Sequence, residues 1–337
     1  MVTLITGAAG YIGSHVTDLL VSNGETVVAI DSLVNGFPQA LAHLDKEKFT
    51  FLQGDVRDSS LVEQIINEYK VDSIIHFAAY IEVGESVTDP LKYYENNIMG
   101  AISLLQAMRN SSCKHIVFSS TAALFGVPES TPIPDDAPTK PINPYGESKL
   151  FVEHILKASA HAYGIKFVSL RYFNACGAHP SGDIGEAHNP ESHLIPIILQ
   201  VALGKRQSIK IFGTDYPTRD GTCVRDYVHV VDLADAHYKA LLHLRKGNES
   251  GCFNLGSGNG FSVREVIEVA REVTGHAIPA IEDVRRPGDP AVLIADSRGA
   301  ETVLGWKKQF SDIKTVIESA WKWHSKHPNG YESPVIE

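Results

Sequence analysis

Short apolar runs alternate with longer amphipathic segments through the first half of the chain. The apolar runs are rich in Val, Ile and Phe, as buried strands are, whereas the segments between them repeat their apolar residues with the period of a helix. We predict strands at residues 3–5, 26–30, 49–53, 73–77, 115–119 and 166–171, and helices at 13–22, 60–68 and 100–109. Because strands and helices alternate, we expect a parallel sheet covered by helices on both faces, in a doubly wound α/β fold.

The alternation becomes looser beyond residue 174. Gly, Pro, His and Asp accumulate between residues 177 and 196, which predicts a long loop, and long loops in compact chains are commonly functional. Helices are predicted after it at 194–203, 232–244, 263–274 and 313–324, with strands at 209–212 and 252–255. We therefore expect a first domain over residues 1–174 and a smaller α/β lobe over 175–337, with an approximate boundary because the chain can cross between them.

Charge and hydropathy restrict the classes of partner and the cellular location that we expect for the chain. The net charge is −10 and the pI is near 5.8, with no block of Lys or Arg, so nucleic acid and anionic membranes are poor partners. We see no basic segment ahead of an apolar stretch at the start and no run of about 18 apolar residues, so we expect neither a signal peptide nor a membrane span. A cytoplasmic protein is expected.

Cysteines and histidines give no pattern typical of disulfides or metals. The scattered cysteines, with no C-x-x-C pair, favour a reducing compartment; they are Cys113, Cys176, Cys223 and Cys252. No pair among the fifteen histidines has metal-ligand spacing with a carboxylate partner, and His188 is among those expected at surface or helix positions. We therefore expect no metal site.

A glycine-rich turn follows the first predicted strand and opens the first predicted helix. Gly7, Gly10 and Gly13 let the backbone turn sharply and approach a pyrophosphate, whose charge then meets the N–H groups of the helix start. The turn is a weak signal alone, but Asp31 ends the next strand at the distance of a ribose-binding acid. This carboxylate would repel a 2′-phosphate, so the turn indicates a Rossmann domain that binds NAD in preference to NADP.

A second acidic residue closes the third predicted strand. Asp55, followed by Val56, stands where a contact with the adenine edge of the cofactor is expected. A lone acid at this position is equally suited to cap the following helix, and the sequence leaves both interpretations open.

Tyr145 and Lys149 lie one turn apart at the start of a predicted helix and so share a face. A free tyrosine has a pKa of about 10, too high for a base at neutral pH. A neighbouring ammonium together with a positive nicotinamide ring would favour the phenolate. Alone, this pair is common by chance, and its meaning depends on a third group.

That third group is the segment Ser119-Ser120-Thr121 at the carboxyl end of a buried strand, where ligands bind in open α/β sheets. The Thr121 hydroxyl can hydrogen-bond a reacting oxygen and hold it against Tyr145. Together with the NAD turn, these residues predict an enzyme that oxidises a hydroxyl group.

With these motifs, the chain resembles the extended short-chain dehydrogenase/reductases over essentially its whole length, and within them the UDP-glucose (UDP-galactose) 4-epimerase family. The motifs that carry the resemblance are residues 7–13, Val83-Gly84-Glu85-Ser86, 94–97, 119–121, 145–149, Arg171-Tyr172-Phe173-Asn174, 177–182, Asp226-Tyr227-Val228-His229 and Arg285-Arg286-Pro287-Gly288-Asp289. Those of the second half are far more specific than the glycine turn.

The resemblance implies two sets of binding residues. The NAD site would consist of Gly7, Gly10, Tyr11, Ile12, Gly13, Asp31, Ser32, Leu33, Asn35, Gly36, Asp55, Val56, Phe77, Ala78, Ala79, Ile81, Asn96, Ser119, Lys149 and Phe173. The UDP-sugar, bound by the second lobe, would meet Thr121, Tyr145, Asn174, His193, Leu194, Ile211, Phe212, Gly213, Arg225, Arg286, Asp289 and Leu293. Arg225 and Arg286 have the fork geometry that suits a diphosphate.

The activity implied is C4 epimerisation of a UDP-hexose, with tightly bound NAD and a transient 4-keto sugar, as in galactose metabolism. A nucleotide-sugar 4,6-dehydratase is the nearest alternative, but it needs an acid/base pair after the catalytic threonine, where this chain has Ala122 and Ala123. An NAD-binding regulatory protein is the non-enzyme alternative, and it would not need Thr121, Tyr145 and Lys149.

Departures from the family pattern leave the exact sugar open. They are Thr121 for serine, Phe125 for tyrosine, Ile81 for lysine and His193 for asparagine. Leu293 stands at the position that limits room at the sugar C2 group, so UDP-N-acetylhexosamine and UDP-pentose 4-epimerases remain alternatives. Residues 89–109 and 148–163 resemble the helices that pair in homodimers of the family, so a homodimer is expected.

Overall fold

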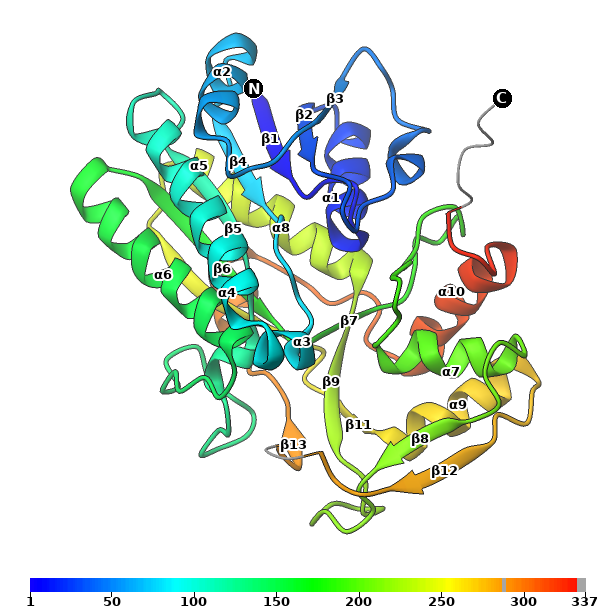
Figure 1. The fold of residues 1–337 in the computed structure, drawn as a ribbon. Coiled ribbons are helices and arrows are strands. Elements are labelled where there is room, and N and C mark those ends of the chain that lie inside the picture. Colours follow the sequence, from blue (N-terminus) through cyan, green and yellow to red (C-terminus); the bar gives the residue numbers. More distant parts are fainter. Residues whose placement is uncertain (287–288, 332–337) are drawn as a thin grey trace.

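The central sheet of the first lobe has seven parallel strands in the order β10-β6-β5-β4-β1-β2-β3 (Figure 1). The computed structural model describes residues 1–286 and 289–331, and this sheet lies within them. The strands are β1 (Val2–Thr6), β2 (Thr26–Asp31), β3 (Phe49–Gln53), β4 (Ser73–His76), β5 (His115–Thr121), β6 (Lys166–Tyr172) and β10 (Gly251–Leu255). Strand order reverses between β1 and β4, the switch point at which open α/β sheets bind ligands.

Helices cover both faces of this sheet, so the doubly wound fold predicted from the sequence is confirmed. One face packs on α1 (Tyr11–Ser22) and α8 (Val230–Arg245), whose apolar sides meet Ile5, Ile75 and Val117. The other face packs on α2 (Ser59–Tyr69), α5 (Met99–Arg109) and α6 (Pro144–Tyr163). Both layers bury continuous Val, Ile and Leu surfaces, as a parallel sheet requires.

The chain crosses back from the second lobe to complete the first. After β9 (Val224–His229), α8 packs against α1, and β10 pairs with β6 at the edge of the sheet. The predicted strand at 252–255 is therefore an edge strand of the NAD-type domain. The division at residue 174 is only approximate, because no local pattern marks which sheet a strand joins.

The second lobe is smaller and is built around a separate apolar cluster (Figure 1). Its helices are α7 (Leu194–Ala202), α9 (Val263–Thr274) and α10 (Ile313–Lys326). Its strands are β7 (Asn174–Cys176), β8 (Ile209–Phe212), β9 (Val224–His229), β11 (Gly260–Ser262), β12 (Ala280–Asp283) and β13 (Val292–Leu293). β9 pairs with β7, β11 and β13, while β8 pairs with β12.

Short helical turns flank the edge of the sheet where the site is expected. They are η1 (Pro38–Leu41), α3 (Val83–Thr88), α4 (Pro90–Tyr93), the π-helical turn η2 (Tyr94–Ile98), η3 (Ala122–Phe125) and the π-helical turn η4 (Ala300–Leu304). Residues 177–193 carry no helix or strand, in line with the predicted long loop. Within the described residues, every helix is too short or too polar to cross a bilayer.

Candidate active site

The glycine turn between β1 and α1 contains glycines of two kinds. Gly7 has φ of 72°, and a Cβ there would lie 2.6 Å from the Ala78 nitrogen. A Cβ on Gly13 would lie 2.1 Å from the Gly7 carbonyl oxygen. Gly10, by contrast, has φ of −79° and its Cβ would meet no atom closer than 3.3 Å. Gly7 and Gly13 are needed by the fold itself. Gly10 instead leaves open space beside the helix start, which fits a bound pyrophosphate.

The first turn of α1 presents unpaired N–H groups to this space. Gly10 is the N-cap and offers no side chain to them, and the first turn contains no acidic residue. The N–H groups of Tyr11 and Ile12 therefore point toward a place where an anion is favoured. The phenol of Tyr11 donates to the Gly177 oxygen at 2.6 Å, which ties the turn to the loop of the second lobe.

Asp31 at the end of β2 is suited to hold a ribose. Its carboxylate accepts the N–H of Ala9 at 2.9 Å and that of Leu33 at 2.8 Å, which leaves lone pairs on both oxygens for a further donor. Burial raises the pKa of Asp31, against the effect of these two hydrogen bonds. A Cβ on Gly36 would lie 2.8 Å from Asp31 Oδ1, so glycine lets the loop pass over the carboxylate. Ser32 and Asn35 are exposed in that loop.

Asp55 lies beyond β3 but does not cap α2. The N-cap of α2 is Asp58, whose side chain accepts from the Leu61 N–H, so the capping interpretation of Asp55 is wrong. Asp55 instead pairs with Arg57 at 2.7 Å, and this hydrogen-bonded guanidinium lowers the pKa of the carboxyl group. Val56 beside it is buried.

The remaining predicted NAD residues border the same edge. Phe77 follows β4 and packs on His237, with ring centroids 4.7 Å apart, and Ala78 lies against Gly7. Of the others, Ile81 is exposed. The rest are half-buried, namely Ala79, Asn96 and Phe173. Sequence reasoning missed Asn97, which is buried and bonds both the N–H and the oxygen of Tyr80, at 2.9 and 3.1 Å. The motif at 94–97 contains this residue, but within it we assigned only the neighbouring Asn96 to the NAD site.

Tyr145 stands in the first turn of α6, close to the end of β5. The Asn143 side chain caps the helix by accepting the Gly146 N–H at 2.8 Å. A Cβ on Gly146 would lie 2.7 Å from the Ala123 oxygen, so the helix start packs directly on the turn that follows Thr121. As a result, the Thr121 hydroxyl lies close enough to the Tyr145 phenol to lower its pKa. The structure brings together the two groups that the sequence placed apart.

Burial raises the pKa of Tyr145, and the neighbouring Thr121 hydroxyl offsets that rise only in part. The negative charge of Glu82, which sequence reasoning did not single out, raises it further. The protein's own groups therefore do not prepare a phenolate. From the sequence we expected Lys149 and a bound nicotinamide to lower the pKa of Tyr145 together. Lys149 alone does not produce that lowering.

Lys149 is buried one turn further along α6, with 3% of its surface exposed. Its ammonium donates to the Ser119 carbonyl oxygen at 2.8 Å and lies 5.0 Å from the centre of the Phe118 ring. Burial lowers the pKa of Lys149 to about 7. A lysine that is only half protonated at pH 7 is thus kept in an apolar place, which is common where a side chain serves chemistry.

A buried ion pair holds the Ser-Ser-Thr segment from beneath. Glu153 of α6 accepts the Ser120 hydroxyl at 2.7 Å and binds the Arg171 guanidinium through both of its oxygens, at 2.9 and 2.6 Å. The two charged side chains are 0% and 5% exposed. Because such a pair is rigid and has one geometry, it fixes the register of β5 against α6.

On the substrate side, Arg225 of β9 is held by Asp289 at 2.5 Å and donates to the Val224 oxygen at 2.8 Å. The Arg286 guanidinium lies 4.2 Å from the centre of the Phe212 ring and is otherwise exposed. Gly213 follows β8 with φ of 83° and lies under neighbouring side chains; Ile211 is buried in the strand. Pro287 and Gly288 of the same motif lie outside the described residues.

Two other predicted substrate residues begin the second lobe. Asn174 of β7 donates to the Asp226 oxygen at 2.8 Å, which joins it to β9. His193 is the N-cap of α7, and Leu194 is its first residue. Asp226 is a structural centre that sequence reasoning missed: it is fully buried and accepts from Ser257 through both N–H and hydroxyl.

Leu293 of β13 lies beside the predicted diphosphate arginine. β13 pairs with β9 so that Leu293 stands opposite Arg225. Its side chain also packs on a small cluster that contains Ala122, Phe125 and Phe173. This placement, between the NAD edge and the second lobe, is where a residue could limit the size of a bound sugar.

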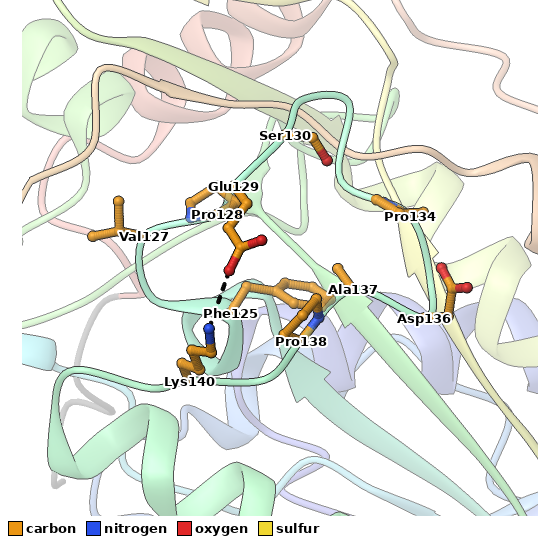
Figure 2. A pocket seen from close by; sticks show the side chains of 10 residues that line it. All are labelled: Phe125, Val127, Pro128, Glu129, Ser130, Pro134, Asp136, Ala137, Pro138 and Lys140. Atoms are coloured by element: carbon orange, nitrogen blue, oxygen red, sulfur yellow. Dashed lines mark hydrogen bonds and ion pairs between the residues drawn. The ribbon is translucent and has the colours of Figure 1, made fainter.

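A cavity of about 200 Å³ lies on the outer side of that cluster (Figure 2). Its lining runs from Phe125 to Lys140, and Figure 2 shows Glu129 and Lys140 paired across it, at 3.1 Å. None of the predicted NAD or sugar residues lines it. Phe125 thus belongs both to the lining of this cavity and to the small cluster that contains Leu293.

Comparison with known proteins gives one family. The family model described as GDP-mannose 4,6 dehydratase matches residues 4–319. The UDP-glucose 4-epimerase of Halalkalibacterium halodurans is 54% identical over 99% of this chain and 98% of its own length.

Solved structures agree with this result. A crystal structure of UDP-glucose 4-epimerase superposes with a TM-score of 0.95 at 46% identity, covering 99% of this chain and 100% of its own. The UDP-glucose 4-epimerase from Bifidobacterium longum, in complex with NAD+ and UDP, gives a TM-score of 0.92 at 41% identity, over 98% and 100% of the two chains. By sequence and by fold, the chain belongs to the UDP-glucose 4-epimerase family of extended short-chain dehydrogenase/reductases.

Proposed function

We propose that the protein interconverts UDP-glucose and UDP-galactose by inverting the configuration at C4, with NAD as a resident cofactor. The observation that carries the proposal is that the Tyr145 phenol lies beside the Thr121 hydroxyl, at the carboxyl edge of the sheet and one turn from the buried Lys149. Relatives that share this fold nearly end to end bear the name of that activity, and one was solved with NAD+ and UDP bound.

The NAD site fits residues that the structure itself singles out. Gly10 leaves room at the start of α1, and Asp31 keeps free lone pairs for a ribose. NAD, when bound, supplies the acceptor for the hydrogen at C4 and a positive charge that favours the phenolate of Tyr145. Lys149 adds its own charge from beneath the site.

Tyr145 takes the proton of the C4 hydroxyl and later returns it, so that no proton is gained or lost in a cycle. Thr121 holds the reacting oxygen against the phenol. The transient 4-keto sugar must present both faces to the same tyrosine, which requires a firm hold on the nucleotide and a loose one on the sugar. Arg225 and Arg286 are the groups that would provide that hold at the diphosphate.

The 4,6-dehydratase alternative is disfavoured at the turn after Thr121. Ala122 and Ala123 form the start of η3 and have no group that transfers a proton. A dehydratase needs such a group to remove water from the sugar after C4 oxidation. The description of the matching family model names a dehydratase, so product analysis is part of the test.

The purified protein should be incubated separately with UDP-galactose, UDP-N-acetylgalactosamine and UDP-xylose, with the products separated by chromatography. We expect UDP-galactose to give UDP-glucose. If no UDP-sugar is inverted at C4, the epimerase proposal fails; release of a 4-keto-6-deoxy sugar, detected by its absorbance in alkali, would favour the dehydratase. Turnover of the other two sugars decides whether an N-acetylhexosamine or a pentose is accepted.

A homodimer is part of the proposal. Leu91 of α4, Met99 of α5 and Phe151 of α6 are large apolar side chains, 74, 49 and 52% exposed, on the helices expected to pair. In light scattering, Phe151→Asp should give a monomer, whereas Ile281→Asp, an equally exposed apolar position on β12, should leave the dimer intact. A monomeric parent protein would contradict this part.

A cytoplasmic location is also proposed. Its support is that all the cysteines are free thiols, three of them buried, which suits a reducing compartment. Cell fractionation with an antibody against the protein tests it.

A further inference from the structure

Four side chains from the loop after β7 converge between the two lobes. Glu186, His188, Glu191 and His193 each offer one nitrogen or oxygen atom, and these four atoms lie within 4.8 Å of one another. The two carboxylates are 4 and 3% exposed, and the histidines 17 and 41%. No proton or hydride step of the proposed reaction uses this group of four, which we call the Glu-His cluster, although the family resemblance places one member, His193, beside the nucleotide.

The atoms of the cluster are close together but are not hydrogen-bonded to one another. Glu186 Oε1 lies 2.7 Å from His193 Nδ1 and 3.2 Å from His188 Nδ1. All three atoms are buried, and none has a hydrogen-bond partner. At such distances this means that no ring N–H is aligned with the oxygen, and the atoms are close enough together to contact one ion.

The separations match those between ligands of a metal ion. Zn²⁺ binds histidine nitrogen and carboxylate oxygen at about 2.0–2.2 Å, which places two tetrahedral ligands roughly 3.3 Å apart. The histidine–carboxylate distances in the cluster run from 2.7 to 3.8 Å, on both sides of that value. The donor set, two imidazoles and two carboxylates, is one that divalent zinc accepts.

Charge balance leads to the same result. Two buried carboxylates need positive charge close by. Protonating both imidazoles would supply it through ion pairs with the two carboxylates. It would also put two cationic rings 5.2 Å apart. One divalent cation with neutral imidazoles satisfies the same carboxylates and uses both lone pairs.

We propose that Glu186, His188, Glu191 and His193 bind one Zn²⁺ in a closed, structural site. Four protein ligands leave no open position, which is the arrangement of structural rather than catalytic zinc. From the sequence we expected no metal, because no histidine pair was recognised as having metal-ligand spacing with a carboxylate partner. The loop brings them together, and its course is set by the tertiary structure.

The neighbours of the cluster indicate what the ion would hold in place. The Glu191 carboxylate accepts the backbone N–H of His193 at 2.9 Å, and the Trp323 ring of α10 donates to the backbone carbonyl oxygen of Glu186 at 3.0 Å. The His188 ring meets the Tyr11 ring edge-on, with centroids 6.4 Å apart. The ion would thus fix the loop between the NAD turn and the start of α7.

The test is the metal content of the full chain, purified without a polyhistidine tag and passed over a chelating resin. Mass spectrometry should find about one zinc per chain in the parent protein and in the control His161→Ala, an exposed histidine on α6. His188→Ala should lose the ion and bind added Zn²⁺ more than about 100-fold more weakly, since losing even an outer partner costs 10–100-fold. A strong chelator should lower the unfolding temperature of the parent but not that of His188→Ala.

If His188→Ala does not fold, X-ray absorption at the zinc edge of the parent protein decides, with nitrogen and oxygen neighbours only and no sulfur expected. The proposal is overturned if the folded parent neither contains zinc nor binds one equivalent of added Zn²⁺. It is also overturned if His188→Ala binds the ion as tightly as His161→Ala. In either case the cluster is an ion-pair network of protonated histidines.

Discussion

Replacing Lys149 with methionine should make the protein more stable while it destroys turnover. Lys149 is 3% exposed, and burial lowers its pKa from 10.5 to about 7. At pH 7 the unfolded chain therefore holds a proton that half of the folded chains have lost. This difference removes about 4 kcal/mol from the free energy of unfolding. The loss grows as the pH falls from 10.5 toward 7, because the folded pKa is the lower one.

Methionine fills a similar volume and carries no charge, so Lys149→Met recovers this energy. It also leaves the Ser119 oxygen without its donor, at a cost of about 1–2 kcal/mol. The net result is a variant about 2 kcal/mol more stable at pH 7, with a gain that disappears near pH 10. Turnover should fall by roughly 10²- to 10⁴-fold, the range of acid–base catalysis.

The assay is urea unfolding of protein stripped of cofactor, at pH 7 and pH 10, with Lys157→Met as the control. Lys157 is on the same helix but exposed, so its replacement should change the free energy of unfolding by less than about 0.5 kcal/mol at either pH. If Lys149→Met were less stable than the parent at pH 7, or its effect were the same at both values, the argument from the buried ammonium would be refuted.

Four further predictions test separate parts of the structure. Gly10→Ala should fold normally but bind NAD at least ~10-fold more weakly, whereas Gly13→Ala should fail to form the turn, because its Cβ would lie 2.1 Å from the Gly7 oxygen; equal NAD affinity in Gly10→Ala and the parent would contradict this. Glu153→Gln leaves the buried Arg171 guanidinium unpaired and should cost about 3–5 kcal/mol, against less than ~1 kcal/mol for Glu249→Gln at the exposed pair with Lys166, both measured by urea unfolding. Because burial lowers the pKa of His76 from 6.5 to about 3, the unfolded chain alone takes up a proton as the pH falls below 6.5. The free energy of unfolding should then drop by up to ~1.4 kcal/mol per pH unit, and His76→Gln should flatten that slope. Leu293→Tyr should abolish any turnover of UDP-N-acetylgalactosamine while UDP-galactose is still converted; unchanged N-acetylhexosamine turnover would remove Leu293 as the residue that limits the sugar.

The fold could be predicted from the sequence wherever local periodicity decides it. The predicted strands of the first half and the segment 263–274 lie within a residue or two of the observed elements, because apolar spacing and capping residues such as Ser262 act locally. The place of β10 could not be predicted, because the sheet that a strand joins depends on contacts between residues far apart in the chain. That choice is made by packing of α8 on α1.

The candidate site shows the same division. Its side chains could be predicted from motifs, since glycine, tyrosine, lysine and acidic residues are chosen for chemistry. Their electrostatics could not, because the pKa of Tyr145 depends on burial and on the charge of Glu82, which is distant in sequence. Asn97 and the Glu-His cluster were missed for a related reason. Asn97 bonds the loop residue Tyr80, and the cluster is formed by a loop, and only the folded chain defines the paths of these loops.

The central claim is that Tyr145 removes and returns one proton while the sugar is oxidised and reduced at C4. The direct measurement compares the parent protein and Tyr145→Phe, each with NAD bound, starting from UDP-galactose and from UDP-glucose. The account predicts that the parent reaches the same mixture of the two sugars from either side without accumulating NADH, and that Tyr145→Phe keeps NAD but turns over roughly 10²- to 10⁴-fold more slowly. Full activity in Tyr145→Phe, or a parent protein that leaves both sugars unchanged, would contradict it.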